Sequence, residues 1–289
     1  MAPPGYRLPD EISLGTVVLQ VSDVARSRAW YERVLGLHAL QASERSVLLG
    51  ARDGAVPLIE LRGGATSALT SHASRLGLFH FAVLLPDRPS LGTFIRHLGE
   101  VGAPFGASDH LVSEALYLRD PDGLGIEVYA DRPRAEWTVS AGQVRMDTIP
   151  LDLDALVAAA GDARWSGMPR AAVMGHVHLH VGSLEDAGRF YHAALGLDKV
   201  VWSYPGALFL SAGGYHHHLG VNTWAGPSAV PPSPDHPRLV EWRMSLPSPD
   251  DVQRVETSLR GAGFAAQPDG ADLVVRDPWG TALRISASR

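Results

Sequence analysis

Apolar and polar residues alternate over short stretches of this chain, and each such stretch is followed by a longer amphipathic one. In residues 14–37, Val17, Leu19 and Val21 share one face of a predicted strand. A helix is predicted next, because a small or acidic residue opens the stretch and Leu-Gly closes it, with Gly36 at the C-terminal cap. The short apolar runs SVLLG and VPLIELRG then predict further strands, so the unit reads βαβββ.

The same unit recurs along the chain. Residues 14–37 align with residues 174–197, where Gly15, Tyr31 and Gly36 each meet an identical residue. A second pair of segments aligns at a similar offset, and an Asp-Pro-x-Gly motif follows in each half of the chain. These segments are 78–90 and 239–251, and the motifs are 120–123 and 277–280. Such self-similarity indicates two homologous halves, each made of two modules.

We therefore predict an α+β fold of four βαβββ modules that form two domains with curved mixed sheets. The modules are expected at residues 14–64, 77–130, 174–225 and 238–287. The first domain is expected at residues 10–135 and the second at residues 173–289. The polar, irregular residues 136–172 are expected to connect them, with one short helical pattern around Leu153–Ala160.

Composition narrows the function classes. Hydrophobic residues make up 45% and charged residues 19%, which is typical of a protein with a sizeable core. No apolar run approaches the roughly 18 residues of a membrane span, and the N-terminus does not resemble a signal peptide, so we expect no membrane partner and a cytoplasmic location. With Lys+Arg 25 against Asp+Glu 31, we expect no nucleic-acid partner. Because cysteine is absent, the 13 histidines are the main source of metal or acid–base chemistry.

Some of these histidines occupy predicted strands, on the face opposite the packed apolar residues. His80 begins one strand, Glu127 lies in the last strand of the same module, and His176 is the first of three alternating histidines in the third module. An unpaired charge buried there costs several kcal/mol, so these side chains need partners. A divalent metal is one explanation, and polar core residues that satisfy one another are the other.

The corresponding positions of the fourth module carry Glu241 and Arg284, and the first module has Thr16 in place of the histidine. The simplest interpretation of Glu241 and Arg284 is a buried ion pair. We therefore predict that the fourth module has no metal site.

The repeated unit, with a helix that ends in Tyr-x-x-x-Leu-Gly-Leu, resembles the vicinal oxygen chelate superfamily, so the expected domains are of the vicinal-oxygen-chelate type. This superfamily includes glyoxalase I, fosfomycin- and bleomycin-resistance proteins and the extradiol ring-cleavage dioxygenases. One segment is similar to the extradiol dioxygenase signature, namely His110-LVSEA-Leu116-Tyr117-LR-Asp120-Pro121-D-Gly123-LGI-Glu127. The chain departs from that signature at Ser108, where the family has Gly, Asn, Thr, Ile or Val. The arrangement looks most like the two-domain catechol 2,3-dioxygenases.

This resemblance implies an Fe(II) site made by His80, Glu127 and His176, with Mn(II) as the alternative metal. In the family, one histidine ligand follows a glycine at the start of a module. Gly175-His176 fits this pattern, whereas the equivalent glycine of the first module is followed by Thr16.

The resemblance also implies three catalytic residues. His217 stands where the family places a catalytic histidine, which serves as base and acid, while His216 and His218 are expected to point to the other face. Tyr117 would fix the substrate with a hydrogen bond, and His110 would hydrogen-bond the substrate or Tyr117 at the pocket rim. The expected reactants are an aromatic diol, catechol or a substituted catechol, and dioxygen, and the expected assembly is a homodimer.

Counting ligands predicts which modules share a sheet. The first two modules together offer Thr16, His80 and Glu127, which is one histidine short. The last two offer His176 beside the predicted ion pair, which cannot hold a cation. Only the second and third modules together contribute the full set, so we predict that these two share one barrel, either within the chain or across a dimer.

Two other functions stay open at this point. A glyoxalase-type isomerase would use Zn or Ni with a fourth ligand, for which Glu60 is the candidate. A non-catalytic small-molecule binder of the drug-resistance type would keep the fold without a metal.

Overall fold

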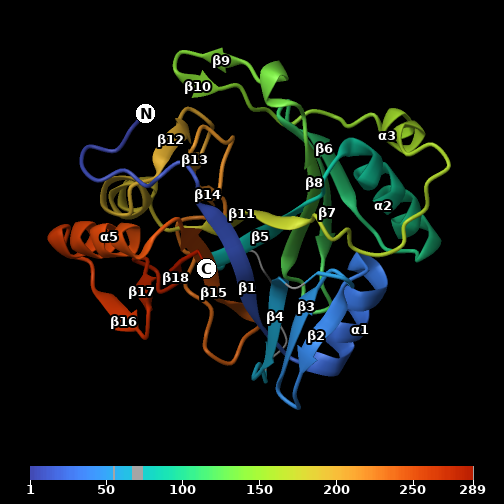
Figure 1. Cartoon of the computed structure of the whole chain (residues 1–289), viewed down its shortest axis with the longest axis horizontal. Helices are drawn as coiled ribbons and strands as arrows, with labels where there is room; N and C mark the ends of the chain where they lie inside the picture. Colours follow the sequence, from blue (N-terminus) through green and yellow to red (C-terminus); the bar gives the residue numbers. More distant parts are fainter. Residues whose placement is uncertain (55, 67–73, 289) are drawn as a thin grey trace.

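Two eight-stranded sheets form the framework of the protein, whose computed structural model describes residues 1–54, 56–66 and 74–288 (Figure 1). The first sheet has the strand order β16 (Ala266–Asp269), β17 (Asp272–Arg276), β18 (Ala282–Ala287), β15 (Arg238–Leu246), β1 (Ser13–Val21), β4 (Pro57–Gly63), β3 (Ser46–Gly50) and β2 (His38–Ala42). The second has the order β12 (Asp198–Val201), β13 (Ala207–Ser211), β14 (Leu219–Asn222), β11 (Val173–His180), β5 (Gly77–Leu84), β8 (Gly125–Asp131), β7 (Ser113–Arg119) and β6 (Gly106–Asp109).

The two sheets combine modules from opposite halves of the chain. In each module the first strand pairs in parallel with the last, whereas the antiparallel pairs β1–β15 and β5–β11 join two modules. The first sheet therefore contains the first and fourth modules, and the second sheet contains the second and third. This order confirms the predicted α+β class and the predicted pairing of the second and third modules, which occurs within one chain. Each sheet thus contains one module from each half of the chain. The expected domain limits, residues 10–135 and 173–289, stay a prediction.

The predicted caps set the limits of the module helices. Asp23 accepts the Arg26 N–H at the start of α1 (Val24–Leu35), and Gly36 follows its end at φ 66°, a conformation that favours glycine. Asp87, Ser183 and Ser248 cap the other module helices in the same way. These helices are α2 (Arg88–Glu100), α4 (Leu184–Ala187), which continues into the π-helical η2 (Gly188–Ala194), and α5 (Pro249–Gly261).

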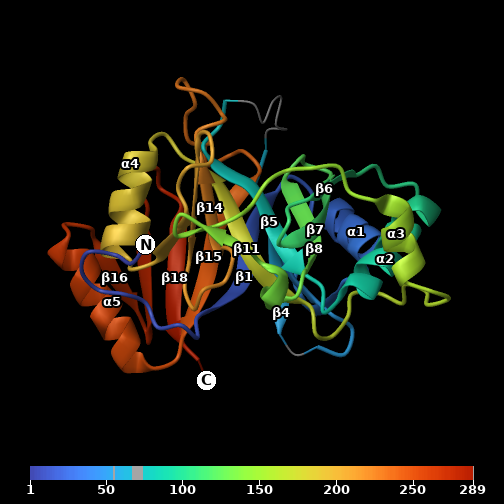
Figure 2. The same cartoon turned by 90° about the horizontal axis from the view of Figure 1, so that it is seen from above.

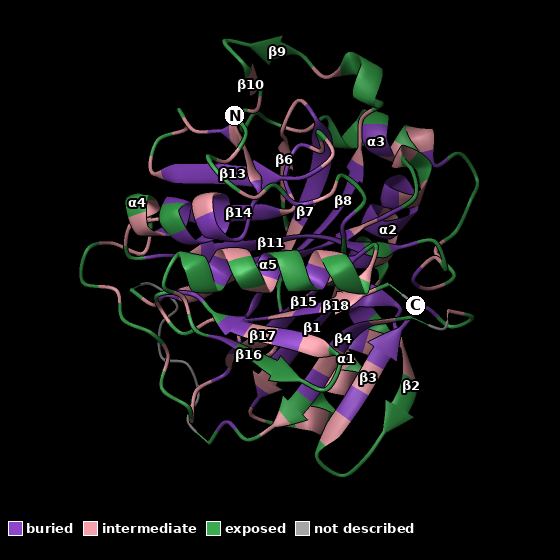
Figure 3. Ribbon diagram, turned by 60° about the vertical axis from the view of Figure 1, so that its left-hand side comes forward, coloured by how far each residue is buried: buried purple, intermediate pink, exposed green. Residues whose placement is uncertain are grey.

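The helices lie at the two ends of the molecule, and the sheets lie between these ends. Figures 1 and 2 place α4 and α5 at one end and α1 and α2 at the other. The apolar strand faces and helix faces form one large core, which includes Val17, Tyr31, Phe94, Val177 and Tyr191. Figure 3 shows this amphipathic arrangement on α5, where buried and exposed positions alternate along the helix. The opposite face of the second sheet is thereby left to carry polar groups.

The repeated Asp-Pro-x-Gly motif connects neighbouring modules. Asp120 accepts the backbone N–H groups of its own turn and a hydrogen bond from the Tyr31 hydroxyl on α1, at 3.2 Å. Asp277 likewise accepts the backbone N–H groups of its own turn and a hydrogen bond from the Tyr191 hydroxyl, at 2.9 Å. Both tyrosines are fully buried, so each motif satisfies a phenol hydroxyl that would otherwise lack a partner.

The connector between the halves runs past the second sheet. It contains η1 (Arg134–Glu136), the short hairpin β9 (Val139–Ser140) and β10 (Gln143–Val144), and α3 (Leu153–Ala159), which confirms the predicted helical pattern. Backbone hydrogen bonds between Asp109 and Ile149 hold the connector against β6. None of the described helices has the length and the apolar character needed to cross a membrane.

Gly175 provides a test of how tightly the two halves pack at the β5–β11 junction. A Cβ at Gly175 would lie 2.0 Å from the hydroxyl oxygen of the buried Tyr129. We expect Gly175→Ala to lower the free energy of unfolding by about 1–3 kcal/mol, because the ring must shift. Urea denaturation measures this change. Gly99→Ala on α2 is the control, since nothing lies within 4 Å of its Cβ, and it should be neutral or stabilise by up to about 1 kcal/mol.

Candidate functional site

Three predicted site residues meet on the polar face of the second sheet. His80 comes from β5, Glu127 from β8 and His176 from β11, and all three are buried. Nε2 of His80 and Nε2 of His176 each lie 3.1 Å from the same Glu127 oxygen, Oε2. One possible ligand atom from each residue lies within 4.8 Å of the other two, so this cluster could hold a metal ion.

Strand register explains the meeting of these side chains. His176 lies opposite Ala82, and Ala82 lies opposite Glu127, so the three residues form one row across the sheet. His80 stands two residues before Ala82 and points to the same face. Because the alanine side chain is short, the two imidazoles and the carboxylate converge over it.

Burial and mutual contacts shift the ionisation of this cluster. Burial raises the pKa of the Glu127 carboxyl, but His176 and His80 together outweigh burial and hold that pKa well below its usual range. Burial lowers the pKa of His80. Nδ1 of His176 is buried and has no hydrogen-bond partner among the described residues, whereas most buried polar groups in proteins are hydrogen-bonded. The cluster thus presents an ionised carboxylate and two imidazoles.

Tyr117 and His110 form a hydrogen-bonded pair beside the cluster. The Tyr117 residue on β7 lies directly opposite Glu127, and its hydroxyl is 2.6 Å from Nε2 of His110. Nδ1 of His110 lies 2.8 Å from the backbone carbonyl of Asp147 in the connector. A carbonyl only accepts, so the His110 proton is on Nδ1, and Nε2 accepts the hydrogen bond from the Tyr117 hydroxyl.

His217 lies on the other side of the cluster, with its ring centroid 4.1 Å from that of His176. Its pKa is lowered well below the usual value by burial. The expectation that His216 points to the other face was wrong, because His216 is buried beside His217 and their Nδ1 atoms are 2.7 Å apart. Asp131 at the end of β8 accepts a hydrogen bond from Nε2 of His216 and so holds this ring beside His217.

A cavity of about 280 Å³ opens onto these residues. Its polar groups come from Glu127, Asp147, the histidines and several hydroxyl side chains, and aromatic rings form much of the rest of its wall. No lysine or arginine is found among the described residues that line it. The lining residues are Phe79, His80, Ser108, His110, Ser113, Tyr117, Glu127, Met146, Asp147, Thr148, His178, Tyr204, Phe209, His217 and Trp224.

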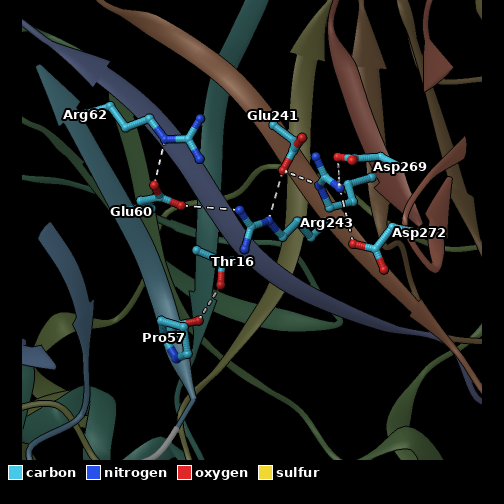
Figure 4. Close-up of polar contacts among 9 residues, drawn as sticks. Thr16, Pro57, Glu60, Arg62, Glu241, Arg243, Asp269 and Asp272 are labelled. Atoms are coloured by element: carbon cyan, nitrogen blue, oxygen red, sulfur yellow. Dashed lines mark hydrogen bonds and ion pairs between the residues drawn. The ribbon is translucent and has the colours of Figure 1, made fainter. Parts of the chain in front are cut away.

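The equivalent face of the first sheet is filled by charged side chains. Arg243 stands opposite Arg284, as Ala82 stands opposite Glu127, and the Arg243 guanidinium bonds Glu241 and Glu60 at 3.0 and 3.2 Å (Figure 4). Arg284 bonds Glu241 at 3.0 Å, which confirms the predicted ion pair.

Two further polar side chains of this sheet, Glu60 and Thr16, also have partners. Figure 4 shows Glu60 between Arg62 and Arg243, and Thr16 donating a hydrogen bond to the Pro57 carbonyl. Glu60 therefore belongs to the first sheet and not to the cluster of the second, which removes the feature that favoured a glyoxalase-type fourth ligand.

Sequence reasoning missed three contributors to the site. Ala82 contributes because its side chain is short. The sequence does contain a sign of this, since the fourth module has the long side chain of Arg243 at the position equivalent to Ala82, two residues after the position of His80. Asp131 and His216 matter through a contact between different modules, for which no local pattern exists.

The fold and the cluster define a protein of four βαβββ modules in which the described residues include a buried cluster of two histidines and one carboxylate. Residues 13–128 match the model of the Glyoxalase/Bleomycin resistance protein/Dioxygenase superfamily. A catechol-2,3-dioxygenase of Bacillus subtilis (strain 168) is 40% identical over 272 residues, which cover 93% of this chain and 95% of the relative. The chain belongs to this superfamily.

Solved structures show the same fold at low sequence identity. A putative dioxygenase from Bacillus subtilis subsp. subtilis str. 168 has a TM-score of 0.64 at 12% identity, covering 98% of this chain and 86% of its own. Glyoxalase I from Zea mays has a TM-score of 0.55 at 15% identity, covering 95% and 92%. The architecture is therefore shared between a protein described as a putative dioxygenase and a glyoxalase I, so that function has to be argued from the site.

The ion pairs of the first sheet lead to a pH-dependent prediction. Burial raises the pKa of Glu241, but the hydrogen bonds from Arg284 and Arg243 outweigh burial and lower it. The stability that Glu241 contributes is therefore complete above the usual carboxyl pKa and is lost as pH falls through the lowered value. We expect Glu241→Gln to cost about 1–3 kcal/mol at pH 7 and less as pH falls, measured by urea unfolding.

Glu256→Gln on α5 is the control, because Glu256 forms an i,i+4 pair with Arg260 on the surface. Its cost should stay under about 0.5 kcal/mol. A deficit of Glu241→Gln that is the same at all pH values would contradict the assignment of the effect to the ionised carboxylate.

Proposed function

We propose that this protein is an Fe(II)-dependent extradiol dioxygenase that cleaves catechol or a substituted catechol with dioxygen. The observation that carries the proposal is the cluster of His80, Glu127 and His176 at a cavity that also contains Tyr117 and His217. Two histidines and one carboxylate, bound on one face of the metal ion, are the ligand set of non-haem Fe(II) oxygenases. The 40% identical relative named catechol-2,3-dioxygenase supports the same reaction.

The spacing of the cluster supports a metal-binding role. Neighbouring ligands of an octahedral ion, bound at about 2.1 Å, lie about 3.0 Å apart. Nε2 of His80 and of His176 are each 3.1 Å from Oε2 of Glu127. The donor set suits Fe(II), and Mn(II) is the alternative with the same preferences. When bound, Fe(II) supplies open coordination positions for the diol and dioxygen, which removes much of the entropic barrier to their meeting.

The residues around the cluster would prepare the substrate. His217 takes a proton from one catechol hydroxyl, since it lines the cavity next to His176 and burial keeps its imidazole neutral. The Tyr117 oxygen, whose proton is donated to His110, offers lone pairs to a substrate hydroxyl and so orients the ring. The reaction breaks the ring bond beside the two hydroxyl-bearing carbons and puts both oxygen atoms into a muconic semialdehyde.

The cavity wall favours an uncharged substrate. Phe79, Tyr204, Phe209 and Trp224 provide aromatic surface, and the described lining has no cationic side chain that would pair with a substrate carboxylate. Burying an unpaired carboxylate is costly, so we propose catechols with no charged substituent as the substrate class.

Metal analysis tests the ligand assignment. We expect protein purified and loaded with Fe(II) under anaerobic conditions to hold about one metal ion per chain, and His176→Ala to lose it, because two ligands cannot replace a facial set of three. The metal is measured by mass spectrometry of the washed protein. His178→Gln, two residues along the same strand, should keep the metal, since His178 bonds Asn222 and not Glu127. Unchanged metal in His176→Ala would reject the assignment, and a wild-type protein without metal would favour the non-catalytic binder.

Ring cleavage is tested with oxygen consumption and product colour. With Fe(II) loaded, catechol and 4-methylcatechol should each consume one dioxygen per yellow ring-opened product. We expect kcat/KM for 3,4-dihydroxybenzoate to be lower by at least about tenfold, because its carboxylate finds no cation in the cavity. His80→Ala should abolish the activity. Tightly bound Zn or Ni with no cleavage of any diol would point instead to an isomerase.

A further inference from the structure

A chain of hydrogen bonds links the cavity wall to Asp131 at the end of β8. Nδ1 of His217 lies 2.7 Å from Nδ1 of His216, and Nε2 of His216 lies 2.9 Å from Oδ1 of Asp131. His216 is fully buried, whereas the Asp131 side chain is 25% exposed. These hydrogen bonds therefore join residues of two modules and lead from the cavity toward the surface.

Aromatic residues hold this chain in place. The His216 ring lies against the rings of Tyr215 and Trp137, with centroids 4.1 and 5.2 Å away. The Tyr215 hydroxyl donates a second hydrogen bond to Oδ1 of Asp131, and the Tyr129 hydroxyl lies 2.6 Å from that of Tyr215. The Asp131 carboxylate is thus fixed from two directions, and it faces only donors in these contacts.

The Asp131 carboxylate determines the direction in which hydrogen bonds are donated from His217 through His216 to Asp131. A carboxylate accepts hydrogen bonds and does not donate them, so Nε2 of His216 carries a proton. With His216 neutral, its one N–H group is the one at Nε2, and Nδ1 is left as an acceptor. Nδ1 of His217 must then donate, and the proton of His217 sits on Nδ1. Nε2 of His217 keeps its lone pair, and no described group forms a hydrogen bond with it.

We propose that Asp131 and His216 are positioning residues that fix the tautomer of His217, with the proton on Nδ1 and the lone pair on Nε2. The kinetic consequence rests on the proposed function, in which His217 accepts a proton from a catechol hydroxyl. In that step the O–H bond of the diol breaks, an N–H bond forms at Nε2, and the proton on Nδ1 stays in place. The opposite tautomer would present a donor where the reaction needs a base.

Asp131→Asn tests the polarity with little change in shape. An asparagine amide can donate to Nε2 of His216, which moves the His216 proton to Nδ1 and forces the His217 proton onto Nε2. Asp87→Asn is the matched control, because the Asp87 carboxylate bonds Ser90 at the start of α2 and none of Asp131, His216 and His217, and asparagine caps helices equally well.

Nitrogen-15 NMR reads the tautomer directly, without any need for activity. We would record long-range nitrogen–proton correlations of the histidine-labelled protein loaded with diamagnetic Zn(II), and assign His217 with His217→Gln. The expected result is a protonated Nδ1 in the wild type and in Asp87→Asn, and a population protonated on Nε2 in Asp131→Asn. A wild-type His217 protonated on Nε2 would overturn the proposal, and so would a His217 that keeps its proton on Nδ1 alone in both Asp131→Asn and His216→Leu.

Kinetics of the Fe(II) protein provide the second readout. We expect Asp131→Asn to lower kcat for catechol on the order of tenfold to a hundredfold, with KM changed less than about threefold. His216→Leu should show the same loss, whereas His216→Gln should recover part of kcat, since its amide can both accept from His217 and donate to Asp131. Equal losses in the Leu and Gln variants would mean that His216 acts only through packing. If the wild type cleaves no diol, the proposed function fails, while the NMR result still decides the tautomer.

Discussion

The antiparallel pairing of β5 with β11 is the contact on which the rest of the site depends. It joins backbone segments from opposite halves of the chain and places His176 in one row with Ala82 and Glu127. The same register directs Phe81 and Val177 to the opposite face, where they enter the core. A slip of β11 by one residue would move His176 into the apolar layer, so that core packing and the polar cluster stabilise the same register.

The polar faces of the two sheets surround their buried carboxylates with different side chains. In the second sheet the side chain at the centre of the row, Ala82, is short, and two imidazoles and a carboxylate meet beside it. In the first sheet Arg243 occupies the equivalent place and supplies its own positive charge to Glu60 and Glu241. A buried carboxylate needs a cation, and one face meets that need with a guanidinium while the other is suited to a metal ion.

Two hydrogen-bonded chains approach the cavity, and each ends on a group that only accepts. The Asp147 carbonyl sets the direction of the chain through His110 to Tyr117, and the Asp131 carboxylate sets the direction of the chain through His216 to His217. Because neutral histidine has one proton to share, an acceptor at the far end decides which atom faces the cavity. The chemistry of the cavity is thus controlled by residues that do not line it, as well as by those that do.

The sequence by itself determined the modules, their helix caps, the faces of the strands and the residue types of the cluster. These features are local, since side-chain periodicity and cap chemistry act within a few residues. Ligand counting went further and predicted that the second and third modules pair, because only that pair offers His80, Glu127 and His176. Only the tertiary structure decided that this pairing occurs within one chain, that Ala82 opens the site, and that His216 turns toward His217. Backbone ladders form between any compatible strands, and the Asp131–His216 contact joins segments 85 residues apart, so no local pattern could encode them.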